Sequence, residues 1–301
     1  MPPHSAPRPS GIVSAALVAT AAVLTLSGCS ASPKSEIKES SSASASPESW
    51  SLPLQAYMPT TEEMSQLAQA KKILISDCME GLGLAWAPAP DLPRVGPKTL
   101  TDWRYGIHDE GLAAARGYKV DAAEQEAYDA AVEKGAVDGS TANSIDARAL
   151  EGRIEKVNGR KVPAGGCVGA ANKRIDADAV QARTALDLAN AAFVTSQREA
   201  EVVQAFADWS ACMKRDGYDY KEPLNASDDP KFASDTPSSQ EIATATTDIA
   251  CRKRTDVARI WFQAESRLQK QAIEDHAEDL SAERKKIDSA VRTASEIVTG
   301  T

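Results

Sequence analysis

Apolar residues recur at helical spacing along most of the chain beyond residue 59, and no long stretch alternates strictly between apolar and polar positions. Two helices are predicted to begin at capping boxes, in which Ser or Thr is followed three residues later by Glu. These boxes are Thr60 with Glu63, and Ser196 with Glu199. The apolar positions behind them are Met64, Leu67, Ala68, Ile75, Cys78 and Met79 in the first helix, and Val202, Phe206, Trp209 and Met213 in the second. We therefore expect a mostly α-helical fold.

Both predicted helices end in the same short motif. ISDCMEGLGLAW and WSACMKRDGYDY share Ser-x-Cys-Met-x-x-x-Gly, followed by an apolar or aromatic residue, one spacer and a second aromatic residue. Gly81 or Gly83 is expected to end the first helix and Gly217 the second, because glycine readily takes the left-handed conformation that follows a C-cap. We interpret the motif as a helix end whose Cys and Met point into the core, and not as a reactive site.

The region between the two motifs is expected to hold loops and shorter helices. WAPAPDLPRVGPKTLTDWRYG is rich in proline and predicts an ordered loop anchored by Trp86, Trp103 and Tyr105. The other expected elements are a short helix over residues 122–134, a loop or hairpin with a short helical turn over 135–166, a long alanine-rich helix over 168–194 and a loop over 219–237.

The last segment, from Gln240 to Val298, contains neither glycine nor proline. Helical spacing runs through it, and the apolar positions from Leu280 to Val298 recur at nearly heptad steps between many charges. A pattern of this length without an internal cap predicts one extended helix or a helical hairpin that projects from the body of the domain.

The N-terminus has the features of a secretory signal. A charge-free apolar run from Ile12 to Leu26 is too short for a membrane span of about 20 residues and has the size of a signal h-region. It ends in Leu-Ser-Gly-Cys, which resembles the bacterial lipobox, so residues 1–28 are expected to be removed and Cys29 to be diacylated. An ordinary secretory signal is the alternative. Because two acyl chains hold a protein stably, we expect a lipid-anchored protein on the outer face of the plasma membrane.

Residues 29–58 are rich in serine, alanine and proline and predict a flexible tether, with Trp50 and Leu54 expected to begin the docking onto the domain of residues 59–301. The formal net charge of the chain is −9, and removal of the signal takes away one basic residue, which leaves −10. Nucleic acid is therefore a poor candidate for a partner, and membrane contact is expected through the lipid alone.

Four cysteines remain after Cys29, namely Cys78, Cys167, Cys212 and Cys251. An even number in an oxidising compartment predicts two disulfides, for which three pairings exist. If the repeated motif marks two copies of one unit, over about 60–170 and 196–255, Cys78 pairs with Cys167 and Cys212 with Cys251. A redox or zinc site is the alternative, but the chain has no Cys-x-x-Cys, and its three histidines show no ligand spacing.

The densest polar and aromatic cluster is DWRYGIHDEG, from Asp102 to Gly111. Its His-Asp-Glu run suggests acid–base chemistry or a metal site, yet three consecutive residues rarely face one centre, so a loop that covers the core is favoured. Asp176 and Asp178 are too sparse for a calcium loop. We expect no metal, no cofactor and no catalytic residues. The residues that a ligand or partner surface would use are Trp86, Trp103, Tyr105, His108 and Trp261.

Several segments together resemble a group of actinobacterial secreted lipoproteins of unassigned function. These are the lipobox, the serine-rich tether, RYGIHDEG, NGRKVPAGGCVG, WSACMKRDGY and EIATATTDIACRKRTDVARIWF with the charged helix behind it. The resemblance runs from about residue 60 to 297 and carries over no activity or catalytic residue. It implies an accessory role at the cell envelope.

Two functions fit these patterns. The first is a non-enzymatic envelope protein whose terminal helix offers its charged face, or its stripe from Leu280 to Val298, to a protein partner. The second is a module that binds a small ligand or cell-wall fragment between the loops that carry Trp86, Trp103, Tyr105, Tyr218 and Tyr220.

Overall fold

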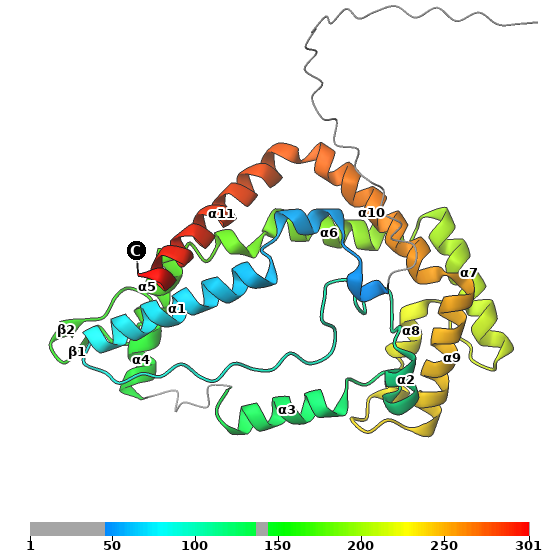
Figure 1. Cartoon of the computed structure of the whole chain (residues 1–301), viewed down its shortest axis with the longest axis horizontal. Helices are drawn as coiled ribbons and strands as arrows, with labels where there is room; N and C mark the ends of the chain where they lie inside the picture. Colours follow the sequence, from blue (N-terminus) through cyan, green and yellow to red (C-terminus); the bar gives the residue numbers. More distant parts are fainter. Residues whose placement is uncertain (1–45, 137–143, 301) are drawn as a thin grey trace, which may run out of the picture. The chain divides into compact units, whose positions relative to one another are not determined.

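The fold is mostly helical, as the sequence predicts (Figure 1). The computed structural model describes residues 46–136 and 144–300, all within the unit Ser41–Thr301. Its α-helices are α1 (Thr61–Gly81), α2 (Glu110–Arg116), α3 (Ala122–Glu133), α4 (Ile145–Glu151), α5 (Gly166–Arg174), α6 (Arg183–Ser196), α7 (Ala200–Arg215), α8 (Pro223–Ser227), α9 (Ser239–Thr255), α10 (Val257–Asp275) and α11 (Ala277–Thr299). Short 3₁₀ helices are η2 (Pro47–Ser49), η3 (Pro53–Tyr57), η4 (Ala179–Gln181) and η5 (Pro230–Phe232), and a hairpin joins β1 (Lys156–Val157) to β2 (Arg160–Lys161).

Helix α1 begins at the predicted capping box. The Thr60 hydroxyl accepts the amide of Glu63, and the Glu63 carboxylate accepts the amide of Thr60. The buried face of α1 changes direction along the helix, because the first half of α1 packs on α11 and the second half packs on α4 and α5. Leu67 and Ala70 face α11, and Ile75 and Met79 lie in the second contact. Met64 and Ala68 belong to the apolar pattern that predicted the helix, but they are exposed.

The two Cys-Met motifs form the same helix end, residue by residue. After α1, the amide of Leu84 donates to the carbonyl of Met79 at 3.0 Å, and that of Gly83 to the carbonyl of Glu80 at 2.8 Å. After α7, Tyr218 donates to Met213 at 3.0 Å, and Gly217 to Lys214 at 3.1 Å. This pair of hydrogen bonds defines a Schellman motif, which needs a positive φ at its glycine; φ is +72° at Gly83 and +91° at Gly217.

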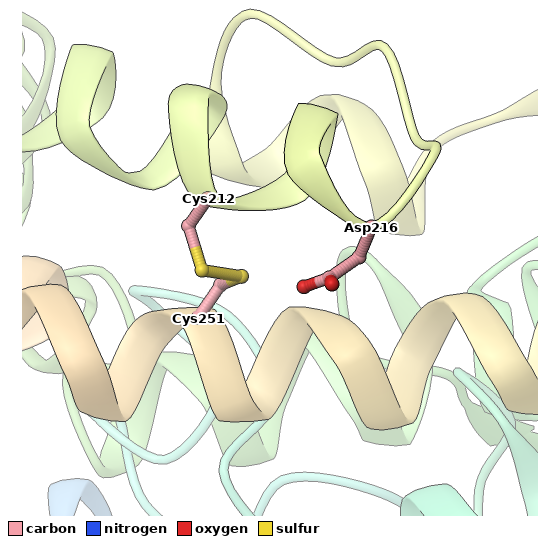
Figure 2. Close-up of side chains that lie close together, drawn as sticks. All are labelled: Cys212, Asp216 and Cys251. Carbon is pink, nitrogen blue, oxygen red and sulfur yellow. A yellow bond between two sulfur atoms is a disulfide. The ribbon is translucent and has the colours of Figure 1, made fainter.

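Each motif is cross-linked to its predicted partner. Cys78 of α1 is bonded to Cys167 of α5, with a Cα separation of 5.6 Å. Cys212 of α7 is bonded to Cys251 of α9, with a Cα separation of 5.7 Å (Figure 2). Between the first two cysteines, the chain forms the predicted hairpin, and its Asn158 side chain donates to the carbonyl of Leu82. The hairpin thus binds a carbonyl at the end of α1 that the helix itself leaves unpaired.

The predicted helix over residues 168–194 is two helices, α5 and α6, separated by η4. Asp176 and Ala182 have φ of +49° and +47°, which interrupts the helix without glycine or proline. The Glu283 carboxylate of α11 accepts the amides of Thr184 and Ala185 at 2.9 and 3.1 Å, and so caps α6 from another part of the chain.

The predicted capping box at Ser196 is wrong. Helix α6 ends at Ser196, and α7 begins at Ala200 after Glu199. The Ser196 hydroxyl donates to the carbonyl of Phe193 at 2.7 Å and accepts the indole N–H of Trp261 at 2.8 Å. The hydroxyl is therefore a buried hydrogen-bond partner in the core and does not cap α7.

The C-terminal segment is neither one helix nor a hairpin, but three helices, α9, α10 and α11. Asp256 separates the first two with φ of +56°, a conformation that Asp tolerates better than most residues. The long last helix is confirmed, but it does not project, because α11 packs along α1. Leu280, Ile287 and Ala294 are buried, so the apolar stripe belongs to the core and is not a free partner surface.

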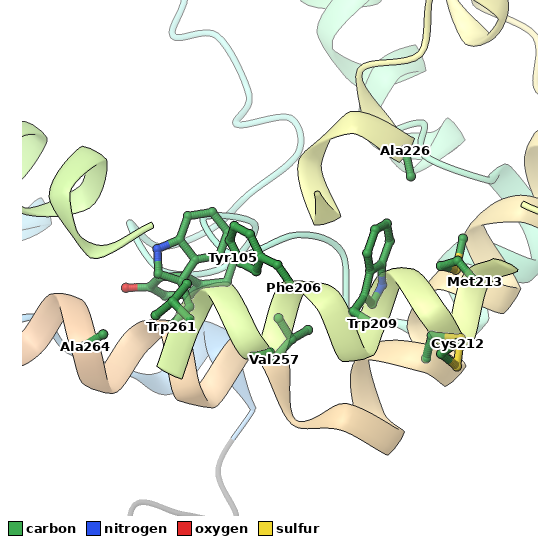
Figure 3. Packing of buried hydrophobic residues seen from close by; sticks show 12 residues of the cluster. Tyr105, Phe206, Trp209, Cys212, Met213, Ala226, Val257, Trp261 and Ala264 are labelled. Carbon is green, nitrogen blue, oxygen red and sulfur yellow. A yellow bond between two sulfur atoms is a disulfide. The ribbon is translucent and has the colours of Figure 1, made fainter. Parts of the chain in front are cut away.

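An aromatic core lies between α7, α10 and the loop before α2 (Figure 3). Trp261 stands at its centre, with ring centroids 5.4 Å from Tyr105, 4.9 Å from Phe206 and 5.0 Å from Phe193. Trp209 and Met213 continue the cluster toward the second disulfide. Trp261 is 1% exposed and therefore belongs to the core.

The segment before α1 is also packed. Trp50 stacks obliquely on Phe262 with ring centroids 4.7 Å apart, and Leu52 and Leu54 are buried. The predicted docking of Trp50 and Leu54 is confirmed. Residues 46–58 are thus part of the domain, although the sequence pattern assigned them to the tether.

Candidate functional site

The loop before α2 is fastened by a buried polar network. Arg104 donates from Nε and Nη2 to the carboxylate of Glu265 at 2.7–3.1 Å, and Tyr105 donates its hydroxyl to the same carboxylate at 2.7 Å. Burial, with the Glu265 charge beside it, raises the pKa of Tyr105 far above its usual value, so Tyr105 is a neutral donor. Gln269 completes this group, since it donates to Glu265 and accepts the amide of Leu54.

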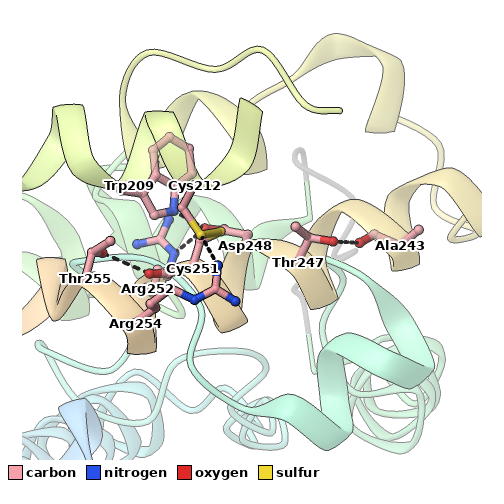
Figure 4. Close-up of a disulfide and its surroundings, with 9 residues drawn as sticks. All are labelled: Trp209, Cys212, Ala243, Thr247, Asp248, Cys251, Arg252, Arg254 and Thr255. Carbon is pink, nitrogen blue, oxygen red and sulfur yellow. Dashed lines mark hydrogen bonds and ion pairs between the residues drawn. A yellow bond between two sulfur atoms is a disulfide. The ribbon is translucent and has the colours of Figure 1, made fainter. Parts of the chain in front are cut away.

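A second buried group holds the next residues of the loop. Arg252 of α9 pairs with Asp248 at 2.7 Å (Figure 4). It also donates to the carbonyls of Tyr105 and Pro223. A side chain at Gly106 would collide with the Arg252 guanidinium, and φ there is +102°. The glycine in RYGIH is therefore required by the close approach of the loop to Arg252.

The chain before Trp50 is attached to the same loop by two threonines. The hydroxyl of Thr99 donates to the carbonyl of Glu48 at 2.9 Å, and that of Thr101 to the carbonyl of Trp50 at 2.8 Å. These hydrogen bonds bring together residues that lie about 50 positions apart in the sequence, at the start of the domain and in the loop.

His108 lies where the two segments meet. Its Nε2 is 2.7 Å from Oδ1 of Asp102, and its Nδ1 is 3.3 Å from the hydroxyl of Ser46. Asp102 is 5% exposed, and its other oxygen accepts the amide of Lys98 at 2.7 Å. The carboxylate is thus fixed on one side by the backbone and on the other by the imidazole. A third ionisable side chain, Glu48, completes this group. One carboxylate oxygen of Glu48, one of Asp102 and a ring nitrogen of His108 all lie within 4.8 Å of one another.

A cleft of about 480 Å³ opens beside this group. Trp103 and Leu112 supply apolar wall, and the charged lining residues are Glu48, Lys98, Asp102, His108, Asp109, Arg116, Asp121 and Glu124. Five carboxylates against two permanent cations give the lining a formal net charge of −3 when His108 is neutral. Its field therefore favours a positively charged ligand.

Ser46, His108 and Asp102 follow the order of a nucleophile, a base and an orienting carboxylate. In the serine-hydrolase triad the nucleophile contacts Nε2 and the acid contacts Nδ1, whereas here the two nitrogens are exchanged. Ser46 is exposed and lies directly before the 3₁₀ helix η2. We interpret Asp102 as the residue that orients His108, and Ser46 as a second contact of the ring.

Of the five residues that the sequence proposed for a ligand or partner surface, the structure places only two at one cleft. Trp103 and His108 both line the cleft. Trp86 packs in the other core cluster with Met79 and Cys167, while Tyr105 and Trp261 are each 1% exposed. The structure does not gather the proposed aromatics around one pocket: Trp86 packs in one cluster, Tyr105 lies with Tyr218 and Tyr220 in another, and Trp103 lines the cleft. Sequence reasoning missed Glu48, since no local signal links it to a histidine 60 positions later.

One other group of potential metal ligands is Cys212, Asp216 and Cys251 (Figure 2). Both sulfurs are already used in the disulfide, and the guanidinium of Arg254 lies 3.0 Å from Sγ of Cys212 (Figure 4). A bonded sulfur has no thiolate to offer a metal ion, so we interpret this group as structural.

The chain matches no protein-family model, no curated protein and no solved structure. Among residues 46–136 and 144–300, no helix is both long and apolar enough to span a membrane.

Proposed function

We propose that this chain is a lipid-anchored, extracytoplasmic binding module that acts without catalysis and takes a small cationic ligand into the cleft at His108. The observation that carries the proposal is the negatively charged lining around the His108–Asp102 pair, with Trp103 as an apolar wall. An aromatic face beside carboxylates suits an organic cation as well as a metal ion. A deep polar network fixes the loop, so the cleft is largely formed before a ligand enters.

The cellular location is part of the proposal. Two disulfides are typical of a protein that folds outside the reducing cytoplasm, and this supports export. The predicted signal, residues 1–28, and the lipidated Cys29 lie outside the described residues. Metabolic labelling with a palmitate analogue should mark the wild-type protein, and Cys29→Ser should abolish the label and release the protein from the membrane fraction.

The ligand is tested by melting temperature and intrinsic fluorescence of the full chain. The panel contains organic amines, quaternary ammonium compounds, neutral sugars with cell-wall fragments, and anions of similar size. Cations should raise the melting temperature, and Trp103→Phe should remove the accompanying fluorescence change. Trp86→Phe is the matched control, because Trp86 lies in another cluster. No response to any cation, or a response that needs Trp86 instead of Trp103, would refute the proposed cleft.

A protein partner at the C-terminal helix remains a second proposal, restricted to the charged face of α11. Lys285, Lys286 and Arg292 are exposed on this face, and the apolar stripe is buried. Deleting α11 would remove part of the core, so charge reversal at Lys285 and Lys286 is the suitable variant. Loss of co-purification from crosslinked cells, with an unchanged melting temperature, would support this partner surface.

A further inference from the structure

We propose that Glu48, Asp102 and His108 bind a divalent transition-metal cation of the zinc class at the edge of the cleft. This inference rests on the proposed function and names the ligand class of the same site. The three side chains offer ligand atoms that all lie within 4.8 Å of one another. Ligands of one zinc ion lie about 2.0–2.2 Å from the metal. Binding therefore requires the exposed Glu48 to move inward, and His108 and Asp102 to exchange their mutual hydrogen bond for bonds to the metal.

The site is preorganised by contacts outside the three ligands. Thr99 fixes the carbonyl of Glu48, and the amide of Lys98 fixes one oxygen of Asp102. Backbone hydrogen bonds to a ligating carboxylate are the outer contacts that orient metal ligands in proteins. The segment 46–50 and the loop 98–108 are therefore held at a separation that suits one ion.

The other carboxylates of the cleft already have structural roles. Asp109 accepts the amide of Leu112 and caps α2, and Asp121 accepts two amides at the start of α3. Glu124 accepts the amide of Gly96 and pairs with Lys98. By contrast, no hydrogen bond or ion pair engages the Glu48 carboxylate within the part of the chain that the structure describes. Apart from Asp102, Glu48 is therefore the carboxylate of the cleft lining that is available to a cation.

The ligand types decide the class of metal. An imidazole nitrogen favours zinc, cobalt or nickel over calcium and magnesium, which prefer all-oxygen sites. Three protein ligands also leave a coordination position open toward the cleft.

The test is titration calorimetry of the metal-free full chain with Zn²⁺, Co²⁺ and Ca²⁺ as chlorides. Zn²⁺ should bind with one-to-one stoichiometry and at least roughly tenfold more tightly than Ca²⁺. His108→Ala, Glu48→Gln and Asp102→Asn should each weaken zinc binding roughly tenfold or more. The visible absorption of bound Co²⁺ gives an independent readout of a nitrogen ligand, and it should disappear in H108A.

Two matched controls test the assignment. His276→Ala removes an exposed histidine between α10 and α11, and Glu110→Gln removes an exposed acid beside the loop; both should leave zinc affinity within about twofold. The melting temperature of each variant without metal separates lost binding from lost folding. Zinc binding that survives H108A, or calcium binding as tight as zinc, would overturn the metal site. If zinc does not bind while organic cations still raise the melting temperature, only the metal site is refuted. If neither zinc nor organic cations bind, the proposed function is refuted as well.

Discussion

Arg104 and Glu265 form a buried, bidentate ion pair across 161 positions of the chain. The guanidinium belongs to the loop that leads to His108, and the carboxylate to the middle of α10, where it is fully buried. Tyr105 and Gln269 add two further hydrogen bonds to the same carboxylate. The pair therefore fixes the loop to the helical body, and with it the position of the candidate site.

Arg104→Ala should destabilise the domain strongly, because it leaves the Glu265 charge buried without its partner. Removal of one member of a buried pair typically costs about 3–5 kcal/mol, and chemical denaturation would measure the loss. Arg267→Ala is the matched control. Arg267 lies on α10, as Glu265 does, but its ion pair with Glu201 is solvent-exposed and should contribute no measurable stability. Equal midpoints for the two variants would contradict a structural role for Arg104.

Two glycines of the repeated motifs should respond in opposite ways to alanine. Gly217 has φ of +91°, and Gly81 is helical; a Cβ at either position would meet nothing within 4 Å. The substitutions thus differ in backbone conformation alone. Gly217→Ala should lower stability by about 1–2 kcal/mol, and Gly81→Ala should leave it unchanged or raise it slightly. A destabilised Gly81→Ala variant would show that packing, not conformation, sets the requirement.

Removing each disulfide should loosen its own part of the domain. The loop-entropy model gives about 4 kcal/mol for the 39-residue separation and about 5 kcal/mol for the 89-residue separation. In the double variant Cys78→Ala/Cys167→Ala, hydrogen exchange should rise in α4, α5 and the hairpin. The variant Cys212→Ala/Cys251→Ala serves as the reciprocal control, with faster exchange in α7 and α9. Faster exchange throughout the chain in both would argue against two separate units.

Local chemistry made the helix ends and the disulfide pairing predictable. The Cys-Met motif carries its own glycine, and its hydrogen bonds join residues at most five positions apart, such as Met79 with Leu84 and Met213 with Tyr218. Because the two motifs repeat, they also selected one cysteine pairing out of three, and the structure confirms it.

What the sequence did not predict depends on residues far apart in the chain. The break before α6 is stabilised by Glu283, about 100 positions downstream, and the break at Asp256 uses a left-handed residue that is not glycine. The candidate site needs Glu48 beside His108, which the hydroxyls of Thr99 and Thr101 bring about. Such contacts leave no periodicity in the sequence, so only the folded chain reveals them.

Glu63 should contribute to the loss of stability at acidic pH. Burial alone would raise the pKa of its carboxyl above 4.5, but hydrogen bonds from Arg284 and from the Thr60 amide outweigh burial and lower the pKa. A carboxyl with a lower pKa in the folded state stabilises the protein above its unfolded pKa, and this contribution is lost as the pH falls through the folded pKa. Glu63→Gln should therefore flatten the loss of stability below about pH 4.5, since Gln keeps the capping box without the charge.

Glu62→Gln is the control for this measurement, because Glu62 is an exposed neighbour in the same helical turn. Melting temperatures between pH 7 and pH 3 would provide the comparison. If Glu63→Gln follows the wild-type curve throughout, the pair with Arg284 contributes nothing to acid stability.

The apolar face of the last helix should contribute to the stability of the domain. Ile287 is fully buried with Leu280 and Leu54, whereas its neighbour Lys286 is exposed. Ile287→Ala should cost about 2–5 kcal/mol through lost burial and an unfilled cavity, while Lys286→Ala should leave the denaturation midpoint unchanged. A near-neutral Ile287→Ala variant would mean that the stripe is not held against α1 and α6 in solution, and the apolar face of α11 would again become available to a protein partner.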